Sequence, residues 1–99
     1  MKRAVLLVLV SVLMLTTVSV FAQRPITLRL GETHPADYPT TKGDYEFARL
    51  VKERSGGRIT VEVYHSKQLG EEKAVIEQVQ LGAIDFTRVS LSVMASFVR

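Results

Sequence analysis

After residue 25 the chain alternates three strand-like segments with two helix-like segments, and the connections between them are short. The strand patterns cover residues 26–30, 58–65 and 83–89, and the first alternates apolar Ile26, Leu28 and Leu30 with polar residues. Crossovers this short favour parallel strands with helices packed on the sheet, joined in the right-handed sense. The sequence therefore predicts an α/β fold with a parallel βαβαβ sheet.

The first helix-like segment has a polar start and a glycine stop. Thr41, followed by Asp44 three positions later, approximates a capping box, so we expect the helix to begin there. Phe47 and Val51 give the segment an apolar face. Gly56 can adopt the left-handed conformation that ends a helix, so the expected end lies at the glycine pair 56–57.

The second helix-like segment lies between two glycines. Gly70 is an acceptable N-cap, and Glu71 and Glu72 place negative charge on the free amides of the first turn. Gly82 ends the pattern, and Ala83 alone would connect it to the third strand. These glycines predict a helix that returns the chain tightly to a parallel strand.

The amino-terminal residues 1–22 resemble an export signal. Lys2 and Arg3 precede a largely apolar run, and the segment ends in Val20, Phe21 and Ala22, with small residues at the positions that signal peptidase reads. The alternative is an uncleaved membrane anchor, since the run approaches the length that spans a bilayer. We expect a cleaved signal peptide at 1–22 and a periplasmic remainder at 23–99.

The composition of residues 23–99 excludes several classes of function. These 77 residues carry eleven Lys or Arg and ten Asp or Glu, a formal balance of +1, which predicts no basic surface for nucleic acid or lipid. The chain has no cysteine, which excludes disulfides, thiolate metal sites and cysteine nucleophiles. A chain of this length buries only about 60% of its unfolded surface. We therefore expect an incomplete domain.

Candidate binding residues lie where the expected strands end. Ligands of parallel α/β sheets sit beyond the carboxyl ends of the strands, near the point where strand order reverses. The polar residues at those ends are Glu32, Thr33 and His34 after the first strand, His65 and Ser66 after the second, and Ser90 to Ser92 after the third.

None of these residues forms a pattern specific for catalysis or for a metal. His34 and His65 are 31 positions apart, and neither has a partner histidine at metal-ligand spacing. Glu71 and Glu72 are adjacent in a helix and point in different directions, so they do not form an acid and base pair. Asp85 could brace a backbone amide near the third strand. The sequence predicts no enzyme, no cofactor and no metal.

The quoted segments together resemble one family. "LRLGETHPADYP", "SGGRITVEVY" and "QLGEEKAVIEQVQLGAIDF", in this order and spacing, are similar to the amino-terminal part of the extracytoplasmic solute-binding subunits of TRAP transporters, of the dicarboxylate-binding type. The resemblance covers about residues 26–92. It implies a two-lobed α/β fold, of which residues 23–99 would be an incomplete first lobe. It also implies capture of a small, C4-dicarboxylate-like organic acid for delivery to membrane permease subunits.

The resemblance also implies ligand positions. Thr33 and Ser90 match positions that line the ligand cleft of the family, and His34 and Glu32 are their neighbours. The arginine with which the family chiefly holds the ligand carboxylate would lie beyond this segment. Arg88 is not assigned that role, because it falls within the pattern of the third strand, where we expect it to disturb packing or to extend to the sheet edge.

Two other interpretations remain open. The chain could be a truncated remnant without binding activity, or a small membrane-anchored structural protein that retains residues 1–22.

Overall fold

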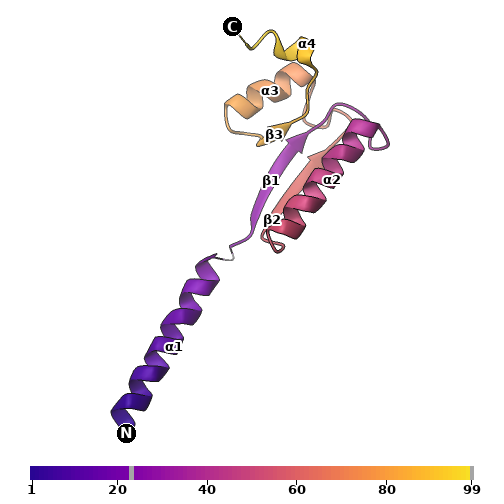
Figure 1. The fold of residues 1–99 in the computed structure, drawn as a ribbon. Helices are drawn as coiled ribbons and strands as arrows, with labels where there is room; N and C mark the ends of the chain where they lie inside the picture. The colour runs from indigo at the N-terminus through magenta and orange to yellow at the C-terminus, as the bar shows by residue number, and fades with distance from the viewer. Residues whose placement is uncertain (23, 99) are drawn as a thin grey trace.

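The computed structural model describes residues 1–22 and 24–98, with side chains for 1–13 and 24–98. A long helix, α1 (Lys2–Ala22), extends away from a small α/β unit (Figure 1). The unit contains β1 (Ile26–Gly31), α2 (Pro39–Arg54), β2 (Ile59–Tyr64), α3 (Glu72–Gln80), β3 (Phe86–Thr87) and α4 (Leu91–Met94). Within the part of the chain so described, no helix combines the length and apolarity needed to cross a bilayer.

The three strands form one parallel sheet in the order β2-β1-β3. Ile26 pairs with Ile59 at the start of β1, and Gly31 pairs with Tyr64 on one side and with Thr87 on the other. The predicted parallel α/β fold is therefore confirmed. The carboxyl ends of β1 and β3 lie side by side, because Leu30 pairs with Phe86 and Gly31 with Thr87 (Figure 1).

The two longer helices of the α/β unit cover opposite faces of the sheet. Leu30 and Phe86 are register partners and share a face, and the Phe86 ring packs edge-on against Phe47 of α2, with ring centroids 5.4 Å apart. Gly31 points to the other face, because successive strand residues alternate. A Cβ atom on Gly31 would lie 2.7 Å from Cγ1 of Val75 in α3. The apolar core of both layers is Leu30, Val61, Val75, Ile76 and Ile84.

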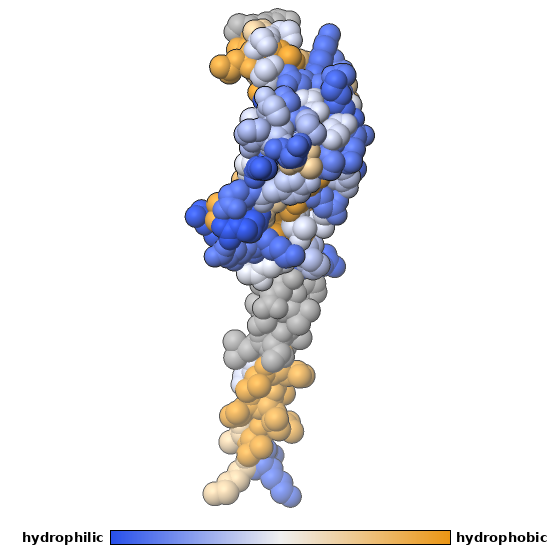
Figure 2. Space-filling model, turned by 90° about the vertical axis from the view of Figure 1, so that its right-hand side faces the viewer, coloured by the Kyte–Doolittle hydropathy of each residue, from blue (hydrophilic) through white to orange (hydrophobic). Residues whose placement is uncertain are grey.

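Figure 2 shows where apolar side chains reach the surface. They gather on residues 5–13 of α1 and near the carboxyl-terminal end, where Leu91 and Val98 are exposed, whereas the rest of the α/β unit in this view is mostly hydrophilic. Other large apolar side chains of the unit are also partly exposed, among them Phe47, Leu81 and Phe86.

The helix ends follow the expected glycines. Gly56 has a φ of 65° and Gly82 a φ of 80°. At the end of α3 the amide of Gly82 donates to the carbonyl of Val79, and the amide of Ala83 donates to that of Gln78. This pair of bonds is the Schellman arrangement, and the end of α2 repeats it.

The helix starts differ from the expected ones. The predicted capping box at Thr41 is wrong. Helix α2 begins at Pro39, and the side chain of the preceding Tyr38 makes no capping hydrogen bond. Thr41 is a fully buried residue inside the helix. Proline has a fixed φ suited to the first helical turn, so it starts the helix two residues earlier. The N-cap of α3 is Glu71 rather than Gly70, because Gly70 has a φ of 121°.

The third strand is much shorter than the predicted 83–89. The carboxylate Oδ2 of Asp85 accepts a hydrogen bond from the amide of Arg29 at 2.8 Å, so a side chain takes the place of a ladder carbonyl. At the other end, Oγ1 of Thr87 donates to the carbonyl of Gly31 at 2.9 Å. Asp85 therefore braces the backbone as the sequence indicated, and the ladder is limited to two residues.

Candidate functional site

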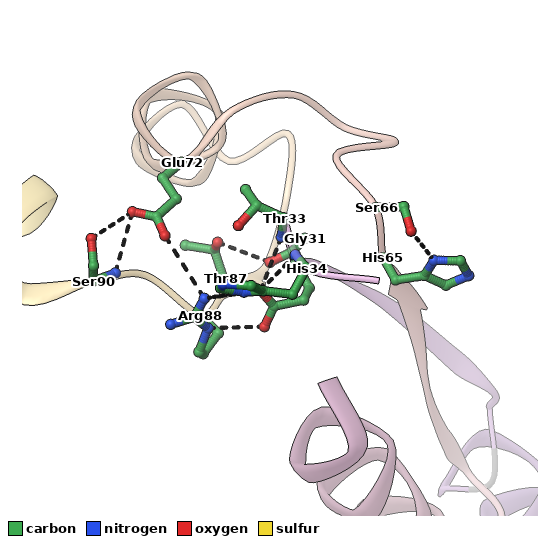
Figure 3. A network of polar contacts seen from close by, with 10 residues as sticks. Gly31, Thr33, His34, His65, Ser66, Glu72, Thr87, Arg88 and Ser90 are labelled. Atoms are coloured by element: carbon green, nitrogen blue, oxygen red, sulfur yellow. Dashed lines mark hydrogen bonds and ion pairs between the residues drawn. The ribbon is translucent and has the colours of Figure 1, made fainter. Parts of the chain in front are cut away.

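Polar side chains from three elements meet at the carboxyl ends of β1 and β3 (Figure 3). We call this group the strand-end cluster; it consists of Glu32, Thr33, His34, Glu72, Arg88 and Ser90. Glu32 and Arg88 each directly follow a strand, and Glu72 lies in the first turn of α3. The parallel register brings these positions together, because Gly31 and Thr87 are partners.

Glu32 is the centre of the strand-end cluster, and its side chain has no exposed surface. Its Oε2 accepts a hydrogen bond from Nε of Arg88 at 2.9 Å, and its Oε1 accepts one from Nη2 at 3.1 Å. The amides of Thr33 and His34 also donate to Oε1, at 3.0 and 3.2 Å. A buried carboxylate therefore has the paired guanidinium and the amide donors that such a charge needs.

These donors determine the ionisation of Glu32. Burial by itself would raise the pKa of this carboxyl, but hydrogen bonds from Arg88, Asp44 and His34 outweigh burial and lower the pKa to about 2. The contact between Glu32 and Asp44 of α2 has the opposite effect on Asp44. Burial and the neighbouring Glu32 carboxylate raise the pKa of Asp44 to about 7. Glu32 is thus the ionised member of the two carboxyls, and Asp44 retains a proton over most of the acidic range.

Among residues 1–22 and 24–98, the buried hydroxyls of Thr40 and Thr41 beside this pair make no hydrogen bond. They lie in the first turns of α2, which packs against the sheet close to Glu32. Asp44 was expected to cap the helix, and its observed position is inside the protein.

His34 completes the contacts around Glu32. Its Nδ1 lies 2.8 Å from Oε1 of Glu32 and 2.6 Å from Nη2 of Arg88. One ring nitrogen cannot donate to the carboxylate and accept from the guanidinium at once, so the tautomer decides which contact is a hydrogen bond. The ring also stacks on Tyr38 at a centroid distance of 4.1 Å, which fixes its plane.

Ser90 joins the cluster through Glu72. The Ser90 hydroxyl donates to Oε2 of Glu72 at 2.7 Å, and its amide lies 3.3 Å from the same oxygen. Oε1 of Glu72 is in turn 3.8 Å from Nη2 of Arg88. The structure thus links Glu32, Thr33, His34 and Ser90, the four predicted ligand residues, in one network; their role in ligand binding stays a prediction.

The residues after β2 do not join the strand-end cluster with their side chains. His65 contacts the hydroxyl of Ser66 at 2.6 Å, and both side chains lie apart from the other labelled residues (Figure 3). The backbone of this loop does reach the cluster: the Ser66 amide donates to the His34 carbonyl at 2.8 Å, and the Lys67 amide donates to the Glu32 carbonyl at 3.2 Å.

Arg88 is the residue that the sequence interpretation missed. It follows the strand rather than lying within it, and it pairs with a buried carboxylate instead of disturbing packing or extending to the sheet edge. The available signal was the spacing, since a basic residue after one strand and an acidic residue after its neighbour meet at one edge of a parallel sheet.

The sequence profile described as "Bacterial extracellular solute-binding protein, family 7" matches residues 30–99. The chain belongs to this family. This finding confirms the predicted resemblance to TRAP solute-binding subunits.

Known relatives agree with the family assignment. The chain is 34% identical over 68 residues to the "C4-dicarboxylate-binding periplasmic protein DctP" of Rhodobacter capsulatus, which covers 69% of this chain and 20% of the relative. A TRAP periplasmic solute-binding protein from Pseudomonas putida F1, solved with bound D-glucuronate, superposes with a TM-score of 0.71 at 39% identity, over 73% of this chain and 24% of that one.

A second solved structure is the sugar acid binding protein DctPAm from Advenella mimigardefordensis, in complex with galactonate. Its TM-score is 0.73 at 29% identity, over 76% of this chain and 24% of that one. The chain spans about a fifth of the length of the curated relatives that it matches.

Among residues 1–22 and 24–98, no group of three or more His, Cys, Asp or Glu side chains is arranged to hold a metal ion. The strand-end cluster instead offers hydroxyls, carboxylates and one guanidinium at a sheet edge. Such an arrangement can orient a small polar ligand by hydrogen bonds and charge.

Proposed function

We propose that this chain supplies one wall of the ligand site in the periplasmic solute-binding component of a TRAP-type secondary transporter. The component captures a small organic acid and delivers it to membrane permease subunits. Residues 1–22 would direct export. The protein binds its ligand and does not transform it, because the cluster contains no activated nucleophile and no matched acid and base.

The single observation that carries this proposal is the meeting of Glu32, Glu72, Arg88 and Ser90 at the sheet edge where ligands of α/β folds bind. Proteins similar to this chain bind acids of two kinds, C4-dicarboxylates and sugar acids. We favour a sugar acid, because hydroxyl groups of Thr33 and Ser90 at this wall suit a polyhydroxylated ligand.

Calorimetric titration of the full-length protein tests this function. We expect saturable binding of D-glucuronate or galactonate, and weaker binding of succinate. Replacing Thr33 with valine should weaken binding about fivefold, because one neutral hydrogen bond contributes about 1 kcal/mol. Thr27→Val at the opposite end of β1, where the side chain is exposed, is the matched control and should leave affinity unchanged.

Failure of all three acids to bind at millimolar concentration would contradict the proposed function. Equal effects of Thr33→Val and Thr27→Val would remove Thr33 from the site. Tighter binding of succinate than of either sugar acid would replace the sugar-acid class with the dicarboxylate class.

A further inference from the structure

Glu72 controls what the hydroxyl of Ser90 can offer to a ligand. A serine hydroxyl has one proton to donate and two lone pairs to accept with. The proton of Ser90 goes to Oε2 of Glu72 at 2.7 Å, and the hydroxyl of Ser92 lies 3.2 Å away as a donor to Ser90. The remaining free lone pair can only accept, so Ser90 in this arrangement accepts a hydrogen bond from a ligand and does not donate one.

Glu72 also sets the charge of this wall. Arg88 uses Nε and Nη2 on Glu32, at 2.9 and 3.1 Å, and lies 3.8 Å from Glu72. One guanidinium therefore faces two carboxylates, which gives the three groups a net charge of −1. Asp44 lies behind Glu32 and, with its raised pKa, adds no full second charge below about pH 7. His34 faces Arg88 and Glu32 from the β1 side, and the β2 loop contributes only backbone atoms here.

One donor remains at this wall. Nη1 of Arg88 makes no hydrogen bond to any of residues 1–22 and 24–98, and the Arg88 side chain is 27% exposed. The wall thus presents a donor beside acceptors on Ser90 and Glu72. A hydroxyl group can donate and accept at once, whereas a carboxylate can only accept.

We propose that Glu72 is a specificity-determining residue that makes this wall select a ligand hydroxyl over a second carboxylate. The inference rests on the proposed function, since it names the charge class of the acid bound at that site. A second carboxylate here would meet an acceptor-only Ser90 and a net negative charge, and such a like-charge contact disfavours the wrong ligand.

The test compares two acids with the same carbon skeleton. Galactonate ends in a hydroxymethyl group, and galactarate carries a second carboxylate in its place. Calorimetry on the full-length protein gives the ratio of the two dissociation constants. We expect galactonate to bind more tightly than galactarate. Glu72→Gln should reduce this preference for galactonate about tenfold, because the amide oxygen still accepts from Ser90 while the charge is lost.

Two further variants show whether the change in preference comes from the charge at position 72, from charge elsewhere on α3, or from the hydrogen bonds of Ser90. Glu77→Gln removes the same charge from an exposed position of α3 and should leave the ratio unchanged. Ser90→Ala keeps the charge of Glu72 but removes the acceptor hydroxyl, so it should weaken binding of galactonate and change binding of galactarate little. Melting temperatures confirm that each variant is folded.

The outcomes are distinguishable. If both acids bind and the ratio is the same in wild type and Glu72→Gln, or if Glu77→Gln shifts it equally, the role of Glu72 is overturned and the proposed function stands. If wild type binds neither acid nor any other small organic acid, the proposed function falls and this inference falls with it.

Discussion

Replacing Arg88 with methionine is expected to lower the free energy of unfolding of the full-length protein by about 3 kcal/mol. Methionine preserves much of the side-chain length but leaves the Glu32 carboxylate, which has no exposed surface, without its guanidinium. Removing one partner of a buried pair is costly because the remaining charge stays desolvated. Urea unfolding followed by circular dichroism measures the loss.

The control for Arg88→Met is Arg49→Met in α2. Arg49 also contacts two carboxylates, Glu46 at 2.6 Å and Glu53 at 2.8 Å, but all three side chains are more than half exposed. Exposed pairs are screened by solvent, so we expect a much smaller loss. Adding Glu32→Gln to Arg88→Met should cost less than the sum of the single changes, since the uncompensated charge disappears. Equal losses for Arg88→Met and Arg49→Met would contradict the assignment of a buried pair.

Replacing Gly31 with alanine is expected to destabilise the full-length protein by about 1–3 kcal/mol. The new Cβ would lie 2.7 Å from Cγ1 of Val75, and Val75 is only 2% exposed. Valine is branched at Cβ and has few rotamers, so it cannot move aside without disturbing the interface between β1 and α3. Chemical unfolding gives the change in free energy.

Gly43→Ala is the matched control for Gly31→Ala, because Gly43 lies in α2 and a Cβ there meets no atom within 4 Å. Alanine in an open helical position should stabilise by about 0.5–1 kcal/mol. Combining Gly31→Ala with Val75→Ala should cost less than the two single changes added together. A stabilising Gly31→Ala would show that α3 does not pack on β1 as described.

Local signals in the sequence predicted much of the fold. The order of strands and helices follows from the apolar periodicity, and Gly56 and Gly82 end their helices with the positive φ that such stops require. The parallel arrangement follows from the short crossovers. Because carboxyl ends of parallel strands share one edge, the same reasoning placed Glu32 and Ser90 in one neighbourhood.

Features that depend on contacts distant in sequence were not predicted. Arg88 occupies a position where the alternation of Ile84 and Phe86 predicts an apolar residue. Only its pairing with Glu32, 56 positions earlier, reveals its role. The bracing of a backbone amide by Asp85 was predicted, but the shortening of the strand that accompanies its contact with the Arg29 amide was not, because periodicity does not reveal that contact. Thr41 and Asp44 have capping composition, yet Pro39 starts the helix and both residues are buried.

We infer that the ends of β1 and β3 form a wall of the ligand site. Hydrogen exchange measured by mass spectrometry on the full-length protein, with and without saturating galactonate or D-glucuronate, tests it most directly. We predict that the ligand slows exchange in peptides covering residues 31–34 and 88–91, and changes exchange little at residues 26–29. Saturable binding that leaves residues 31–34 and 88–91 unaffected would contradict the claim.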